Sequence, residues 1–142
     1  MKDKEYWKRA IKKKREKYER ARCVSLIYMI IMDEVKIEYQ EKDSLILDSI
    51  SGGLGIDEIC GAYLGGIISM AVMSIHNCSP EIICKVRLML ISELMEKLQA
   101  LSCHELIKKY VDCEGKCDII IIAVLSTVEK ICIENNIWIQ EE

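Results

Sequence analysis

The chain has 142 residues, of which 51% are hydrophobic and 30% are charged, with 7 Gly, 1 Pro and 8 Cys. This composition excludes a disordered, collagen-like or low-complexity chain, and the scarcity of Gly and Pro argues against an all-β protein with many short turns. The net charge of −3 is unevenly spread, because residues 1–22 hold 11 Lys and Arg but only 4 Asp and Glu. We therefore expect an all-α single-domain bundle of about five to six helices, with a long N-terminal helix.

The helices are predicted from apolar residues that recur at helical spacing between capping residues. The first runs over about 4–37. Asp43, Asp57, Ser79 and Ser102 open the next four, and the second of the six ends at Gly52-Gly53. Their expected ranges are 43–50, 57–75, 79–98, a short helix from Ser102, and a last helix over about 116–134. The four isoleucines at 119–122 favour a strand by propensity, but no second strand-like run could pair with them, so we expect a buried helix there.

The charge distribution divides the chain into a basic N-terminal helical arm over 1–22 and a helical four-cysteine domain over 23–142. A basic arm can attract nucleic acid or anionic lipid. This arm lacks a motif that reads DNA, so pairing with the acidic body, its own or that of a neighbouring copy, is the simpler interpretation. We expect no nucleic-acid partner, and a homodimer is compatible with the pattern.

Apolar runs and the N-terminal residues bear on location. The longest apolar stretches, 67–75 and 119–125, are too short to span a bilayer. The first 22 residues contain no apolar block of the kind that a secretory signal has. We therefore expect a cytoplasmic protein without a membrane span, in which clustered cysteines serve metal binding or redox chemistry more often than structural bridges.

The cysteine spacing excludes the compact motifs. No Cys-x-x-Cys pair occurs, which argues against zinc knuckles, a thioredoxin-type motif and c-type haem attachment. Any site must therefore be assembled by the fold from distant helices.

Three cysteines are expected at helix starts, namely Cys60 after Asp57, Cys103 after Ser102, and Cys117 at the last helix. Unpaired N–H groups at a helix N-terminus lower the pKa of a thiol and favour the thiolate, which is both a nucleophile and a metal ligand. The other cysteines are interpreted as core filling at Cys78, Cys84 and Cys132, and as intermediate at Cys113.

Gly61 and Gly65 lie four residues apart on one face of the same predicted helix. Small residues at this spacing let another backbone or a cofactor come close, and plain helix packing explains them at least as well.

The segment Cys60-Gly61-Ala62-Tyr63-Leu64-Gly65 matches Cys-Gly-Ala-x-x-Gly, with Cys23 upstream and Cys103 and Cys117 downstream. In this order of motifs the chain resembles the C-GCAxxG-C-C family of redox-active proteins over about 23–133. The resemblance implies a helical domain with a redox role. A similar domain in split-Soret cytochromes implies an iron–sulfur centre, and residue by residue the implied ligands are Cys23, Cys60, Cys103 and Cys117.

Three functions stay open at this point. The first is electron transfer or redox sensing through an iron–sulfur cluster on those four cysteines, with an unidentified redox partner protein. The second is a thiol–disulfide oxidoreductase or sensor that uses a cysteine pair, with Cys60 and Cys103 the first choice. The third is a structural or binding domain with Cys-ligated zinc or no metal. Cys113 could replace Cys23 or Cys117 as a ligand, and these patterns do not decide whether the chain is an enzyme.

Overall fold

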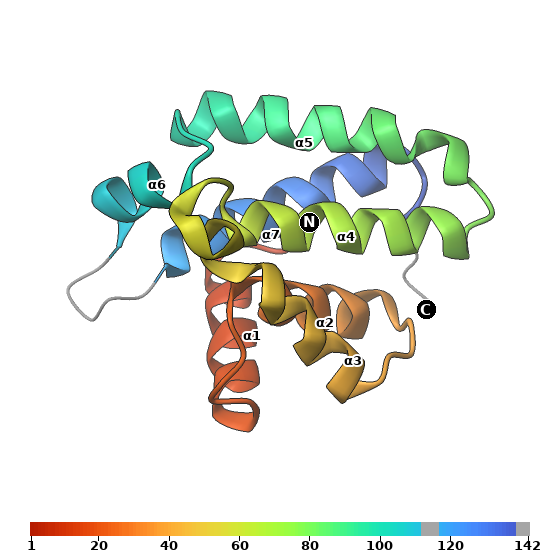
Figure 1. The fold of residues 1–142 in the computed structure, drawn as a ribbon. Helices are drawn as coiled ribbons and strands as arrows, with labels where there is room; N and C mark the ends of the chain where they lie inside the picture. Colours follow the sequence, from red (N-terminus) through yellow and green to blue (C-terminus); the bar gives the residue numbers. More distant parts are fainter. Residues whose placement is uncertain (112–116, 139–142) are drawn as a thin grey trace.

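The computed structural model describes residues 1–111 and 117–138, so the expectations for Cys113, Gly115 and Lys116 lie outside the described residues. Within those two ranges every regular element is helical, which confirms the all-α prediction (Figure 1). The α-helices number seven there, rather than five or six. They are α1 (Lys4–Lys17), α2 (Cys23–Val35), α3 (Glu41–Ile46), α4 (Gly61–His76), α5 (Ile83–Leu98), α6 (Cys103–Tyr110) and α7 (Asp118–Glu134).

Helix α4 lies at the centre of the fold, packed on α2 on one side and on α5 and α7 on the other (Figure 1). Two glycines make these contacts close. A Cβ atom at Gly65 would lie 2.9 Å from the backbone oxygen of Val24, and one at Gly66 would lie 2.9 Å from Cγ1 of Val124. Because glycine has no Cβ, α2 and α7 can approach the backbone of α4 from two directions.

The expected single helix over 4–37 is wrong, because the chain breaks between Lys17 and Cys23. The two resulting helices run in different directions in Figure 1. Helix α1 carries only a narrow apolar stripe, in which Trp7 and Ile11 are fully buried against the bundle. Burying such side chains contributes about 2 kcal/mol each. The break lets this stripe reach α7 while α2 packs under α4, which one straight helix would not allow.

A carboxylate from a distant turn fixes the start of α2. Asp48, in the 3₁₀ turn Leu47–Ile50, accepts hydrogen bonds from the backbone N–H of Arg22 (3.1 Å) and of Ser25 (3.3 Å). It also accepts one from the Ser25 hydroxyl (2.6 Å). Asp48 thus caps the N-terminus of α2, and its negative charge lies at the positive end of the helix dipole.

Two further helix starts differ from the prediction. The second expected helix begins at Glu41 with Gln40 as N-cap, rather than at Asp43. The third begins at Gly61 with Cys60 as N-cap, because a separate turn over Gly53–Asp57 precedes it. The end of the second helix at Ile50, before the left-handed Gly52, is as predicted.

The remaining expected starts are close to the observed ones. Pro80 opens a 3₁₀ turn, Pro80–Ile82, that leads into α5, although Ser79 makes no side-chain cap bond. The Ser102 hydroxyl caps α6 by accepting from the Glu105 N–H at 3.1 Å, as predicted. The isoleucines at 119–122 are helical within α7, also as predicted.

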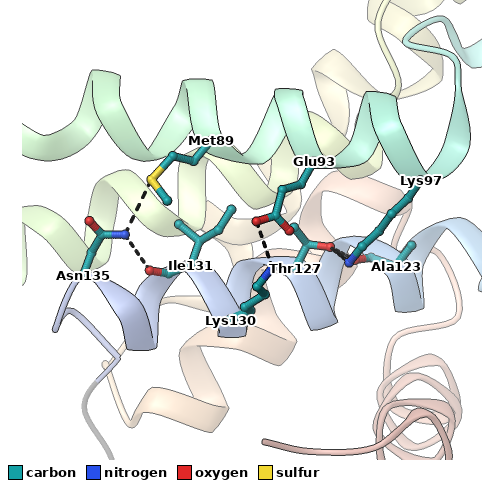
Figure 2. A network of polar contacts seen from close by, with 8 residues as sticks. All are labelled: Met89, Glu93, Lys97, Ala123, Thr127, Lys130, Ile131 and Asn135. Atoms are coloured by element: carbon teal, nitrogen blue, oxygen red, sulfur yellow. Dashed lines mark hydrogen bonds and ion pairs between the residues drawn. The ribbon is translucent and has the colours of Figure 1, made fainter.

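Polar links fix the position of α5 along α7 (Figure 2). The Lys97 ammonium donates to the Thr127 hydroxyl at 3.0 Å, and that hydroxyl donates to the Ala123 carbonyl at 2.7 Å. Further along the same pair, Lys130 pairs with Glu93 at 3.1 Å and the Asn135 amide donates to the sulfur of Met89. These links fix how far α5 is shifted along α7. Since α6 follows α5 in the chain, they also help to set where α6 meets the start of α7.

Ion pairs tie the basic segment over 1–22 to the acidic remainder of the chain. Lys14 pairs with Asp33 at the end of α2, and Arg15 pairs with Asp118 at the start of α7. Longer contacts of 3.8 Å join Lys2 to Glu34 and Lys17 to Glu41. Among the described residues, no helix has the length and apolar character needed to traverse a bilayer.

Candidate four-cysteine site

Four helices begin at one place in the fold, and each begins with a cysteine. Cys23 is the first residue of α2 and Cys103 the first of α6. Cys60 and Cys117 are the N-cap residues of α4 and α7. The last three lie at helix starts, as the sequence indicated. The same position for Cys23 was missed, because the sequence pattern placed it inside one long helix.

The four cysteines line a single cavity of about 300 Å³. They come from well-separated parts of the chain, so only the tertiary packing brings them together. Other residues of the lining come from α1, from the turn before α4 and from the faces of α6 and α7. They include Arg15, Arg22, Gly52 and Gly61.

Backbone contacts place Cys60 next to the start of α6. The Cys60 N–H donates to the carbonyl of Leu101 at 3.0 Å, two residues before Cys103. The buried hydroxyl of Tyr63, one turn into α4, donates to the carbonyl of Ala100 at 2.7 Å. These two bonds fasten the N-terminal turn of α4 to the segment between α5 and α6, and they hold Cys60 beside Cys103.

A tight glycine loop closes another side of the site. Four consecutive residues, Gly52 to Gly55, have positive φ angles between 62° and 79°. A Cβ atom at Gly53 would collide with the backbone nitrogen of Glu58 and lie 3.1 Å from Cβ of Cys103. Only glycine fits Gly53, because it tolerates both the left-handed backbone and this contact. The sequence indicated a turn between helices here, and the structure confirms it.

The two glycines of the motif differ in their surroundings. Gly61 lines the cavity, and a Cβ atom there would lie 3.5 Å from Cβ of Cys23. Gly65 lies against the backbone of α2 at Val24. For Gly65 the structure therefore shows the close approach of another backbone, that of α2. Of the two glycines expected to contact a cofactor, only Gly61 lies beside the cavity.

The thiols of Cys23 and Cys117 are hydrogen-bonded to each other. This bond, burial and the nearby Cys60 and Cys103 raise the pKa of the Cys23 thiol far above its ordinary value. Burial also raises the pKa of Cys60 to about 11, although the backbone N–H groups of Ala62 and Tyr63 oppose the shift.

The expectation that its place at a helix start lowers the pKa of the thiol is therefore wrong for Cys60. The N–H groups act in the expected direction at Cys60, but the removal of this thiol from water raises its pKa by more. The thiols of Cys23 and Cys60 both carry protons at neutral pH in this structure. A metal centre that bound there would release those protons.

Two arginines give the cavity a positive edge. Arg15 and Arg22 both line it, and Arg15 pairs with Asp118, the residue after Cys117. The N-termini of four helices add partial positive charge at the same place. The sequence contained no specific signal for Arg15, which was one of many cations in the basic arm. The combined field suits an anionic group.

The donor set can be compared with what metal centres require. Within the described residues, no group of three or more His, Cys, Asp or Glu side chains is placed to hold a metal ion. The donors that line the cavity are thiols, the ligands that iron–sulfur clusters use. The cavity has about ten times the volume of a liquid water molecule, which is roughly 30 Å³, so it has room for a group of several atoms. In donor type, size and charge the lining suits a cluster, but the described side chains as placed do not form a ready metal site.

The remaining described cysteines lie elsewhere. Cys132 is fully buried within α7, which agrees with the core-filling interpretation. That interpretation is wrong for Cys78 and Cys84, which are exposed near the turn between α4 and α5.

No family model, curated protein or solved structure matches this chain. The resemblance to the C-GCAxxG-C-C family thus depends on the motif residues themselves.

Proposed function

We propose that this protein is a redox protein of the C-GCAxxG-C-C type, which transfers or senses electrons through an iron–sulfur cluster held by Cys23, Cys60, Cys103 and Cys117. The observation that carries the proposal is that these four cysteines, from four helices, line one cavity. Cys78, Cys84 and Cys132, which do not match the family motif, lie outside this lining. That the four motif cysteines share one cavity supports the proposal.

The chain's own residues would do three things for such a group. The four thiolates would bind it, and the helix N-termini and the two arginines Arg15 and Arg22 would offset its negative charge. The apolar side chains of the lining would limit access of water. When bound, the cluster supplies reversible one-electron chemistry. We place the protein in the cytoplasm, where a reducing environment keeps such cysteines available as ligands.

The test is anaerobic purification of the full chain, followed by analysis of iron, zinc and acid-labile sulfide and by a visible absorption spectrum. We expect iron, sulfide and a broad visible absorption that bleaches on reduction. Colourless protein without iron, after reconstitution with iron and sulfide, would contradict the proposal. Zinc without sulfide would support the alternative of a structural zinc domain.

A matched pair of variants assigns the ligands. Cys60→Ser removes a cavity thiol, whereas Cys84→Ser removes an exposed thiol in the first turn of α5. We expect Cys60→Ser to lose most of the bound iron and Cys84→Ser to keep it. Circular dichroism of both variants checks that the helices are intact. Equal loss of iron in both variants would contradict the proposed site.

A second candidate function is favoured by the hydrogen bond between Cys23 and Cys117. In that case the two thiols form a disulfide, releasing two protons and passing two electrons to an oxidant such as glutathione disulfide. The contact points to this pair rather than to Cys60 with Cys103. Mass spectrometry of metal-free protein treated with glutathione disulfide tests it, and absence of a reversible bond between Cys23 and Cys117 counts against it.

A further inference from the structure

The exposed side of α1 carries an unusual density of positive charge. Its apolar stripe is buried at Trp7 and Ile11, so the charged residues occupy the remaining circumference of the helix. Within one helix of 14 residues, six cations have exposed side chains. They are Lys4, Lys8, Arg9, Lys12, Lys13 and Lys17, and we call them the basic face.

A groove of about 490 Å³ lies between α1 and α2, and the basic face supplies Arg9, Lys13 and Lys17 to its lining. The acidic residues of the same groove are already engaged within the protein. Asp33 pairs with Lys14, and Glu34 accepts the hydroxyl of Tyr6 at 2.7 Å. The groove therefore presents a net positive surface to a partner.

The basic segment also reaches the four-cysteine site. Arg15 on α1, and Ala21 and Arg22 just after it, are part of the cavity lining. A partner that lies along α1 would thus be held at the edge of the cavity. Helix α5 packs on the opposite side of α4, away from this surface (Figure 1).

We propose that the basic face of α1 is the docking surface for an acidic electron-transfer protein. The inference rests on the proposed redox function and adds the chemistry of its partner. Opposite charges on two protein surfaces steer encounter and orient the partners, with effects on association rates of about 10 to 10³-fold. The partner would approach α1 with its carboxylates, while its redox centre faces the cysteine cavity.

Other polyanions fit this surface less well. Glu5, Glu16 and Glu19 are exposed among the cations of the 1–22 segment and would repel a continuous phosphate backbone. A membrane surface is disfavoured as well, because the apolar residues that α1 would need for insertion are buried in the core.

The experiment measures binding of an acidic plant-type [2Fe–2S] ferredoxin, as probe, to the full chain at low and at physiological ionic strength. The variant is Lys12→Glu with Lys13→Glu on the basic face. The matched control is Lys85→Glu with Arg87→Glu on α5, which are also exposed and change the net charge equally. We expect binding that weakens with salt, about a tenfold loss in the α1 variant and less than about a twofold loss in the control.

Several outcomes would overturn this proposal. They are equal losses in the two variants, no binding of the ferredoxin at low salt, or tighter binding of a DNA duplex than of the ferredoxin in the same assay. Binding is measured on protein before and after reconstitution with iron and sulfide, so the two proposals fail separately. If the chain takes up no cluster but still binds the ferredoxin, only the proposed cofactor is overturned. If it takes up a cluster but does not bind the ferredoxin, only the partner surface is overturned.

Discussion

The two ends of helix α4 carry cysteines in opposite settings. At its N-terminal end, Cys60 is 5% exposed and shares a cavity with three other cysteines. Past its C-terminal end, Cys78 and Cys84 are exposed near the turn to α5. Three features distinguish the first end: four helices start there, a left-handed glycine loop closes it, and arginines line it. The difference shows that the meeting of helix N-termini, rather than the number of cysteines, marks the candidate site.

The largest expected effect that tests this comparison is in thiol labelling. Cys84 is exposed, whereas Cys132 is fully buried and burial raises its pKa to about 12. We expect iodoacetamide to modify Cys84 faster than Cys132 by a factor on the order of 10³ or more, since Cys132 reacts only after the core opens. Mass spectrometry of timed samples measures both rates, and similar rates would contradict the described burial.

The next effect concerns the glycine loop at the N-terminal end of α4. Gly53→Ala places a Cβ against the Glu58 backbone in a left-handed conformation, so we expect a loss of about 3 kcal/mol in the free energy of unfolding. Gly55→Ala is the control, because its φ is also positive but the space around it is open, and about 1 kcal/mol is expected. Urea denaturation measures both, and equal losses would show that the loop is not packed as described.

A smaller effect compares the capping of helices at the two ends. Asp48→Ala removes three hydrogen bonds at the start of α2, and we expect a loss of about 1–2 kcal/mol in unfolding free energy. Ser79→Ala, at the turn before α5, removes a side chain that makes no cap bond, so the loss should stay within about 0.5 kcal/mol. A larger loss for Ser79→Ala than for Asp48→Ala in the same urea assay would reverse this ranking.

The smallest expected effect concerns the buried Glu129 of α7. Burial and Glu34 raise the pKa of this carboxyl, while the Lys2 N–H, the Lys2 ammonium and the N-terminal amine lower it, with burial the largest influence. A raised pKa means that the folded state holds the proton more tightly, so this carboxyl's contribution to stability is lost as the pH rises through the raised value.

Glu129→Gln keeps an oxygen acceptor for the Lys2 N–H and removes the buried charge. The variant should therefore be slightly more stable than the natural protein at pH 7. The difference in stability between the variant and the natural protein should shrink as the pH falls below the ordinary pKa of a glutamate, because the natural carboxyl is then protonated. Thermal unfolding of both proteins, from neutral pH to below that pKa, measures the difference. A variant that is less stable at neutral pH would show that the charge is favourable where it lies.

Local patterns predicted most of the helices but not their relation to one another. The apolar spacing and the Ser102 cap placed α6, and the isoleucines of α7 were correctly expected as a helix. The break before Cys23 could not be predicted, because Tyr18 and Ala21 continue the helical spacing and the cap, Asp48, comes from a distant turn. A break of this kind depends on tertiary packing, which single-sequence periodicity does not contain.

For the candidate site, too, the sequence predicted the residues but not how they lie relative to one another. The motif selected the four cysteines, and capping signals placed three of them at helix starts. That all four line one cavity, and that Arg15 lies at its edge, follows from the packing of α1, α2, α4, α6 and α7. The raised pKa of Cys60 was missed for the same reason, because the burial of this thiol is a property of the assembled fold.

The meeting of four helix starts also has a consequence for biosynthesis. Cys23 and Cys117 touch although most of the chain separates them, and Cys60 and Cys103 come from the intervening helices. A nascent chain that has left the ribosome only as far as α6 lacks one wall of the cavity. The set of thiols is therefore complete only once α7 has packed against the earlier helices, so any loading of the site reports that these helices have assembled.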